Sequence, residues 1–239
     1  MKIVNCIWEL ANLNKRVAEI SMDREEIIEG MELRVLEKDY DYLVVKLQSC
    51  NFNQYKAISE AGFSFIESQI TITKDFKTPH SITDIYKSLS LQKVIKKEDL
   101  EYVLFSMTSD MFTTDRIYLD SQFAKESSLL RYRNWTRSEF ERGASLYHIC
   151  YNKQNVGFIL FRFENCSMDV LLWGLYEQFQ HRGLGDLIPL SVFYYNDQVA
   201  PINRFTTKVS SNNKGIISKL NNWNFHFSNF EYVFVKHIK

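Results

Sequence analysis

The sequence predicts an α/β fold in which strands alternate with helices. Short β-branched and aromatic runs alternate with amphipathic segments along much of the 239-residue chain. One run, 170–175, is joined by a glycine-bearing turn at 180–185 to a second apolar segment that begins at Leu187. A strand, a turn and a helix in this order leave the first N–H groups of the helix free, at the end where its dipole favours negative charge. We therefore predict an anion site at this turn.

The expected elements of the second half alternate between strands and helices. In order, they are a strand at 91–95, a helix beginning at 97–101, strands at 146–150 and 155–163 with a turn at 152–154, the strand at 170–175, the helix from 187, a strand at 205–210, a helix at 214–223 and a strand at 232–235. In the helix 214–223, Ile216, Ile217 and Leu220 share one side, as an amphipathic helix requires.

The first part of the sequence contains a stretch similar to the last. Residues 42–72 can be laid over 204–234 with a constant offset of 162, which pairs Phe63 with Phe225. Both stretches read strand, polar break, helix, Gly or Asn followed by Phe, and strand. Convergence of two similar pieces and a degenerate second copy explain this similarity equally well.

A polar segment at 76–89, which contains Pro79, is the expected boundary between two parts. We expect a small N-terminal α/β domain at 1–78 with a helix at 14–29, a linker at 79–89 and a larger domain at 90–239. The first domain has no turn like that at 180–185, so we expect it to wall the acceptor pocket or to serve as a scaffold.

The order strand, Q-x-x-G-x-G, helix, strand, Asn, helix, Asn-Phe, strand resembles the C-terminal half of the GCN5-related N-acetyltransferase (GNAT) family. The resemblance implies the acyl-CoA N-acyltransferase fold for 90–239, a mixed, mostly antiparallel sheet flanked by helices, with acetyl-CoA as cosubstrate. It implies that the turn wraps the pyrophosphate of coenzyme A and that Asn213 lines the cofactor cleft. A splayed strand end near Leu175 would leave a backbone N–H free to stabilise the oxyanion. The expected cofactor-binding residues are Leu175, Gln180, His181, Arg182, Gly183, Leu184, Gly185, Asp186 and Asn213.

Two further segments, 115–120 and 132–135, resemble the connection found in bacterial nucleotide-sugar N-acetyltransferases of the dTDP-fucosamine type. Five arginines lie in this region and suit bidentate contacts with a diphosphate on the acceptor. They are Arg116, Arg131, Arg133, Arg137 and Arg142. A solvated helical face explains them equally well.

Acetyl transfer needs a group that takes a proton from the amine, and Asp169 is the candidate general base. It lies on the cofactor strand where the histone acetyltransferase branch of the superfamily places a catalytic Glu, and Glu164 is the second choice. The alternative is that Asp169 only ends a solvent-exposed turn. Many family members carry a Tyr near the leaving thiolate where this sequence has Leu220. Two interpretations are open for Tyr176, Tyr194 and Tyr195: one of them replaces that Tyr as the acid, or they are core residues.

The composition of the chain limits which other functional classes are possible. Lys plus Arg equals Asp plus Glu, 29 each, so no overall charge favours nucleic acid. We expect no membrane span and no secretory leader. The four cysteines form no C-x-x-C pair and the five histidines are scattered, so we expect reduced thiols, a cytoplasmic location and no metal.

Three functional interpretations follow. The first is an acetyl-CoA-dependent N-acetyltransferase that acts on a primary amine of a small molecule, with a nucleotide-linked amino sugar as the leading substrate. The second is a non-catalytic GNAT-like binding module, which the loss of Tyr at position 220 favours. The third, a transferase acting on charged tRNA, would need two full GNAT-like folds, and the first unit is short for one. A homodimer is left open.

Overall fold

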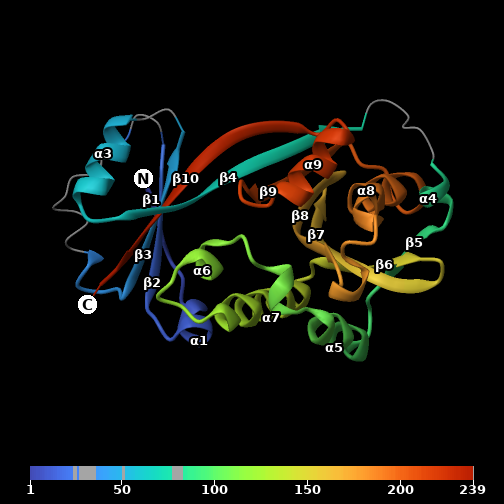
Figure 1. Ribbon diagram of the computed structural model, residues 1–239, viewed down its shortest axis with the longest axis horizontal. Coiled ribbons are helices and arrows are strands. Elements are labelled where there is room, and N and C mark those ends of the chain that lie inside the picture. Colours follow the sequence, from blue (N-terminus) through green and yellow to red (C-terminus); the bar gives the residue numbers. More distant parts are fainter. Residues whose placement is uncertain (24–25, 27–35, 50–51, 77–82, 239) are drawn as a thin grey trace.

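The strands form one continuous sheet in the computed structural model, which describes residues 1–23, 26, 36–49, 52–76 and 83–238 (Figure 1). The ten strands are β1 (Lys2–Asn5), β2 (Val17–Met22), β3 (Tyr42–Gln48), β4 (Ser64–Asp75), β5 (Leu89–Lys93), β6 (Ser145–Tyr151), β7 (Gln154–Glu164), β8 (Ser167–Leu175), β9 (Arg204–Ser210) and β10 (His226–His237). Their order across the sheet is β1-β2-β3-β10-β4-β9-β8-β7-β6-β5. Neighbours are antiparallel except β2 beside β3 and β8 beside β9, which confirms the predicted mixed sheet.

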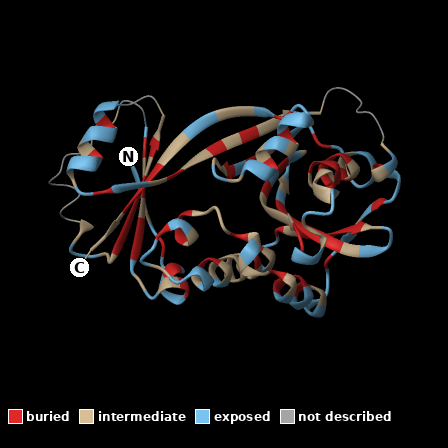
Figure 2. Ribbon diagram, viewed as in Figure 1, coloured by how far each residue is buried: buried red, intermediate tan, exposed pale blue. Residues whose placement is uncertain are grey.

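Helices cover both faces of this sheet. They are α1 (Glu9–Leu13), α3 (Phe52–Glu60), α4 (Asp84–Lys87), α5 (Lys97–Ser106), α6 (Arg116–Leu119), α7 (Lys125–Glu141), α8 (Leu187–Gln198) and α9 (Lys214–Asn222). α8 and α9 pack on one face of the central strands, against Phe161, Val170 and Phe205. α5 and α7 cover the opposite face, against Phe158 and Leu160. Buried residues accordingly follow the strands between these helices (Figure 2).

The sequence repeat has a structural counterpart. Adding 162 to the bounds of β3, α3 and β4 gives the bounds of β9, α9 and β10 without adjustment. The pairing register repeats as well: Gln69 stands opposite Ser210, and Glu231 stands opposite Gln48, positions that the same offset relates. Because element lengths, spacings and register all repeat together, the structure favours a degenerate second copy over convergence.

The two copies exchange their last strands. β4 follows α3 in the chain but pairs with β9 of the second copy, whereas β10 pairs with β3 of the first. β4 and β10 also pair with each other, so both long strands cross between the two halves of the molecule (Figure 1). The sheet is therefore continuous across the predicted boundary, and whether residues 1–78 fold as a domain of their own stays a prediction.

A reciprocal pair of lysines secures the exchanged strands. Lys74 on β4 donates to the carbonyl oxygens of Trp223 and Asn224 at the end of α9, at 3.1 and 3.2 Å, and its Nζ lies 5.2 Å from the Phe225 ring centre. A matching contact is found between the residues that the offset of 162 pairs with these. Lys236 on β10 donates to Ala61 O at 2.7 Å, at the end of α3, and lies 5.6 Å from the Phe63 ring centre. Each lysine thus caps a helix of the other copy with charge-assisted hydrogen bonds.

One expected helix is wrong. Within the predicted helix 14–29, residues 17–22 form strand β2, which lies between β1 and β3. From Ala18 to Met22 the strand alternates, with Ala18, Ile20 and Met22 buried and the polar residues between them only partly so. This alternating signal covers only five residues, and the charged residues that follow it suggested a helix instead. Residues 24–25 and 27–29 of that prediction lie outside the described residues.

Candidate cofactor site

The turn between β8 and α8 needs glycine at its centre. Gly183 has φ +76°, in the left-handed region, and a Cβ at this position would meet no atom within 4 Å. His181 also has positive φ, at 57°. The space beside Gly183 is therefore open to a ligand, and the backbone can approach that ligand closely. Gly185 is placed differently, because a Cβ there would stand 3.0 Å from Cε of Lys219 on α9.

The N–H groups at this turn face no side-chain cap. A single 3-10 turn, Leu184–Asp186, precedes α8, and the N–H groups of Leu184 and Gly185 come before its first hydrogen bond. Asp186, which has a carboxylate suited to capping, instead accepts from Lys219 Nζ at 2.9 Å and from Trp223 Nε1 at 3.1 Å. These contacts hold α9 against the turn and leave the donors free for an anion.

Beside the turn, the two parallel strands separate. Hydrogen-bonded register between β8 and β9 runs from Ser167 to Val170 and stops there, although β8 continues to Leu175. The Tyr176 N–H bonds to Val156 O on β7, so the alternation of a strand directs the Leu175 peptide groups to the opposite edge, towards the gap. A thioester oxygen bound in this gap would need a backbone N–H donor at this place. That the Leu175 N–H stabilises an oxyanion stays a prediction.

The side chains of Gln180 and Asn213 make hydrogen bonds within the protein. The Gln180 side chain donates to Leu175 O at 3.0 Å and so fixes the end of β8. Asn213 is the N-cap of α9, and its Oδ1 accepts from Ile216 N at 3.2 Å. Both side chains shape the walls of the gap between β8 and β9 through contacts within the protein.

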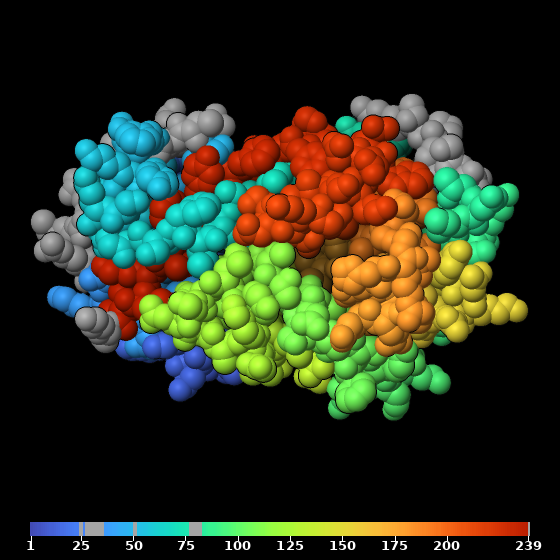
Figure 3. Space-filling model, viewed as in Figure 1, coloured from blue at the N-terminus to red at the C-terminus, as the bar shows by residue number. Residues whose placement is uncertain are grey.

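A hollow lies next to these groups. Figure 3 shows the surface hollowed between the segment around residues 110–130, α9 and the start of α8. A cavity of about 500 Å³ lies on the α5 side of the turn, lined by Phe105, Ser106, Thr108, Glu177, Gln178, Gln180 and Arg182. Arg182 lies over the Phe179 ring at 6.0 Å and is exposed. Together with Gly183, it brings a cation and open backbone to one edge of this cavity.

Asp169 lies in the paired part of β8, opposite Thr206. Its neighbours Met168 and Val170 are buried beneath α8, so Asp169 faces the other side of the sheet, where it is exposed. Partial burial of the carboxyl raises its pKa above the usual 3.8, while Arg162 and Lys208 act in the opposite direction. A base with a raised pKa suits proton abstraction near neutral pH.

The tyrosines proposed as substitutes for the missing acid are packing residues. Tyr176 is fully buried against Phe158 and Tyr102, in the cluster beneath α5. Tyr195 packs edge-on against Phe161 at 5.0 Å. Tyr194 lies 5.8 Å from the Tyr86 ring, and Leu220 is fully buried. The second interpretation of these residues, core filling, is therefore the one that the structure favours.

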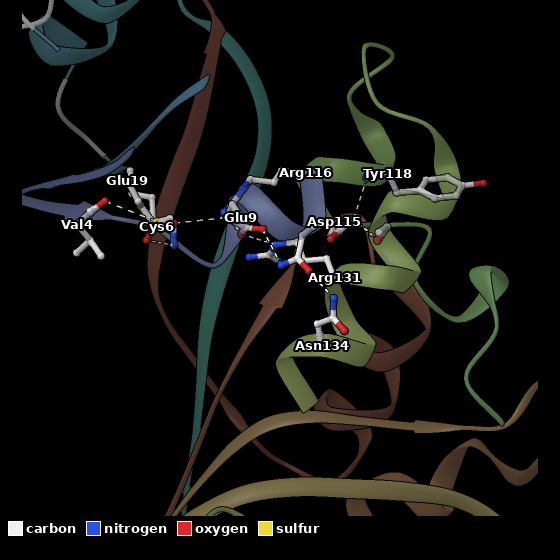
Figure 4. A network of polar contacts seen from close by, with 12 residues as sticks. Val4, Cys6, Glu9, Glu19, Asp115, Arg116, Tyr118, Arg131 and Asn134 are labelled. Atoms are coloured by element: carbon white, nitrogen blue, oxygen red, sulfur yellow. Dashed lines mark hydrogen bonds and ion pairs between the residues drawn. The ribbon is translucent and has the colours of Figure 1, made fainter. Parts of the chain in front are cut away.

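The five arginines have partners within the protein. Arg116 lies beside Glu9 and Glu19, Arg131 binds Glu9, Arg133 donates to Phe105 O and Met107 O, Arg137 binds Glu101 and Arg142 binds Glu139. Figure 4 shows that Arg116 and Arg131 converge on Glu9 between α1, α6 and α7. These contacts give the arginines a structural role and remove the reason to expect a diphosphate there.

Sequence reasoning missed Glu67 on β4. It is 2% exposed, and burial raises the pKa of its carboxyl. Its only sequence signal is a carboxylate within an otherwise strand-like run, because the groups around it come from distant parts of the chain. A buried carboxyl with a perturbed pKa near a candidate site is itself a candidate functional residue.

Two observations concern the part of the chain that the structure describes. No group of three or more His, Cys, Asp or Glu side chains there could hold a metal ion. No described helix is long and apolar enough to cross a membrane.

Comparison with known proteins identifies the fold of this chain. No family model and no curated protein matches the sequence. The structure is similar to a conserved protein of unknown function from Staphylococcus epidermidis (TM-score 0.58, 12% identity, 93% of this chain and 84% of that one). It is similar to a GCN5-related N-acetyltransferase from Kribbella flavida (TM-score 0.56, 12% identity, 92% and 81%). It is also similar to a tandem GNAT protein from the clavulanic acid biosynthesis pathway (TM-score 0.55, 12% identity, 93% and 75%). The chain therefore has the fold of GNAT proteins.

Proposed function

We propose that this protein is an acetyl-CoA-dependent N-acetyltransferase of the GNAT type that acts on a primary amine of a small molecule. The observation that carries the proposal is the uncapped turn at Gly183–Asp186, placed at the open end of the gap between β8 and β9. The turn offers N–H donors and open space to a pyrophosphate, and the gap offers an extended channel for the arm that follows it.

Different residues of the chain serve the binding of the cofactor, the stabilisation of the oxyanion and the transfer of the proton. Acetyl-CoA, when bound, supplies the thioester. The N–H groups of Leu184 and Gly185 would hold its pyrophosphate, with Arg182 adding a positive charge, and the Leu175 N–H would be available to the thioester oxygen. Six strand residues, about 20 Å, separate Asp169 from Leu175, so Asp169 would take the proton of the amine through a chain of water molecules.

The first copy of the repeat does not offer a second cofactor gap among its described residues. β2 and β3 stay in register from Val17 to Met22, along the whole of β2. β8 and β9 separate after Val170. This difference supports an acceptor-side or scaffold role for the first copy. Free Cys6, Cys150 and Cys166 fit a reducing compartment such as the cytoplasm.

The acceptor is proposed here only as a small amine. A nucleotide-linked amino sugar was the finer expectation, but the arginines that would hold its diphosphate bind protein groups instead.

Replacement of Gly183 tests the cofactor site. A Glu side chain would enter the open space beside the turn and place a negative charge against the phosphates, so Gly183→Glu should abolish coenzyme A binding in calorimetry. The matched control is Gly143→Glu, since Gly143 also has positive φ, at 95°, and no atom within 4 Å of a Cβ. It incurs similar backbone strain far from the turn and should bind normally. Equal affinity in both variants would refute the assignment.

Thiol release separates the enzyme from a non-catalytic module. A screen of primary amines with acetyl-CoA should liberate free thiol for at least one amine class. Coenzyme A binding without thiol release for any amine would favour the binding-module interpretation.

A further inference from the structure

Gly174 leaves one face of β8 without a side chain, directly before the Leu175 N–H. Leu172 and Tyr176 pack into the cluster of α5 and α7, whereas Trp173 and Leu175 pack into the cluster of α8. Because side chains alternate along a strand, position 174 faces α5 and α7. A thioester bound to the Leu175 N–H would therefore meet bare backbone on this face.

The side chain of Met111 fills the place beside Gly174. A Cβ at position 174 would stand 3.2 Å from Cε of Met111, which is a close contact. Met111 ends a 3-10 turn, Ser109–Met111, in the loop between α5 and α6, and its N–H bonds to Thr108 O at 3.2 Å. A loop that is distant in the sequence thus supplies the wall that β8 itself lacks.

The loop that carries Met111 is anchored at the next residue. Phe112 is buried, and its ring stacks on that of Tyr132 in α7, with 4.2 Å between the ring centres. Ser128 of the same helix donates its hydroxyl to Phe112 O at 3.3 Å. Because the backbone is held here while the methionine side chain is flexible, Met111 stays beside Gly174 and can yield only at its tip.

Aromatic rings close the opposite face of the gap between β8 and β9. The ring of Trp173 on β8 stacks on the ring of Phe205 on β9, with 5.5 Å between the ring centres, and so bridges the two strands. Phe205 is fully buried, and both rings belong to the cluster of α8. The room for an acyl chain in this gap therefore lies on the side of Gly174, where Met111 limits it.

The cavity of about 500 Å³ beside the turn begins next to this contact. Thr108, the carbonyl partner of the Met111 N–H, lines the cavity, and so does Gln180, which donates to Leu175 O at 3.0 Å. Removal of the Met111 side chain would open the gap at Gly174 towards this cavity.

Building on the proposed function, we infer that Met111 is a specificity-determining residue that limits the transferred acyl group to acetyl. Its side chain occupies the place beside Gly174 into which a longer acyl chain would extend. The chemistry is the same for either chain, since a C–S bond breaks, a C–N bond forms and the amine loses a proton. Chain length alone therefore separates the two reactions.

Calorimetry with acetyl-CoA and butyryl-CoA tests this inference without an acceptor. A methylene that does not fit an apolar pocket costs about tenfold or more, so wild type should bind butyryl-CoA at least about tenfold more weakly than acetyl-CoA. Met111→Ala should remove most of this difference, and Met111→Leu, which keeps most of the volume, should retain it. Leu130→Ala, which truncates an exposed apolar side chain on α7, is the control and should change neither affinity. With any amine that the screen identifies, kcat/KM for the two thioesters should shift in the same direction.

A second substitution at Gly174 shows whether the two residues share one space. The methyl group of Gly174→Ala would refill part of the place that Met111→Ala opens, so the double variant should recover most of the preference for acetyl-CoA. In the wild-type background, the same methyl group meets only the flexible end of Met111.

Equal affinity of wild type for both thioesters, or a preference that Met111→Ala leaves unchanged, would overturn the inference. A preference that Met111→Ala removes but Gly174→Ala does not restore would overturn it as well, because the effect would then come from the loop and not from this contact. The proposed function fails separately, when coenzyme A itself does not bind or when no amine releases thiol.

Discussion

At the scale of single residues, Asp169 offers the most direct test of proton transfer. Asp169→Asn should lower turnover by about two to four orders of magnitude, the span of a general base, while coenzyme A affinity is kept. A base acts only when deprotonated, and the pKa of Asp169 is raised, so wild-type kcat/KM should fall on the acidic side at a higher pH than an ordinary carboxyl would give. This acidic limb should flatten in the variant. The measurement is a pH profile of thiol release.

Glu164 provides the comparison for that experiment, because it is an exposed carboxylate on the neighbouring strand. Full activity in Asp169→Asn with loss in Glu164→Gln would move the base to β7. Full activity in both variants would leave a water chain or an amine that is already neutral.

At the scale of residues, the sequence predicts a feature when the residues that form it are neighbours in the chain. The turn at Gly183 was predictable because its requirements, positive φ and free helix donors, lie within six neighbouring residues. The hydrogen bond from Gln180 to Leu175 O at the end of β8 was not predictable, because only the three-dimensional path of the turn reveals it. Glu67 was missed because its neighbours Asp115 and Ser210 are far away in the chain.

At the scale of elements, the two lysine caps predict how the exchanged strands are held. Lys74→Met and Lys236→Met should each lower the free energy of unfolding by about 1–3 kcal/mol, since each removes charge-assisted hydrogen bonds to helix-end carbonyls. The two caps lie at opposite ends of the β4–β10 pair, so the double variant should show the sum within about 0.5 kcal/mol. Chemical denaturation measures all three values.

Lys93→Met, at an exposed position on the edge strand β5, is the control for the loss of a surface charge and should be close to neutral. A loss in the double variant far below the sum would mean that one cap depends on the other. If Lys74→Met and Lys236→Met lower the free energy of unfolding no more than Lys93→Met does, the capping role of the two lysines is refuted.

Most elements were predictable because their patterns are local. The pair β6–β7, strand β9 and helix α9 appear where alternation and helical spacing placed them. β2 was missed because its alternating part, residues 18–22, is short and is followed by a run of charged residues. The roles of Lys74 and Lys236 were equally invisible, since each caps a helix that lies more than 140 residues away.

At the scale of the whole molecule, the exchange of β4 and β10 decides what can fold alone. The offset of 162 was readable from the sequence, but the exchange was not, because pairing between distant strands leaves no periodic signal. In a fragment of residues 83–239, β9 would lose its neighbour β4, and β10 would lose both β3 and β4. Unpaired strand edges and the exposed core beside them favour aggregation. We therefore expect this fragment to show no cooperative thermal transition.

Co-expression gives the decisive form of this experiment. Fragments 1–76 and 83–239, produced together, should co-purify and unfold in one transition, because β10 inserts between β3 and β4 only when both fragments are present. The binding of coenzyme A should return with that assembly, since β4 supports β9 and β9 forms one wall of the cofactor gap. A fragment 83–239 that is soluble, unfolds cooperatively and binds coenzyme A alone would show that the exchanged strand is dispensable. That result would restore the two independent domains which the polar segment at 76–89 first suggested.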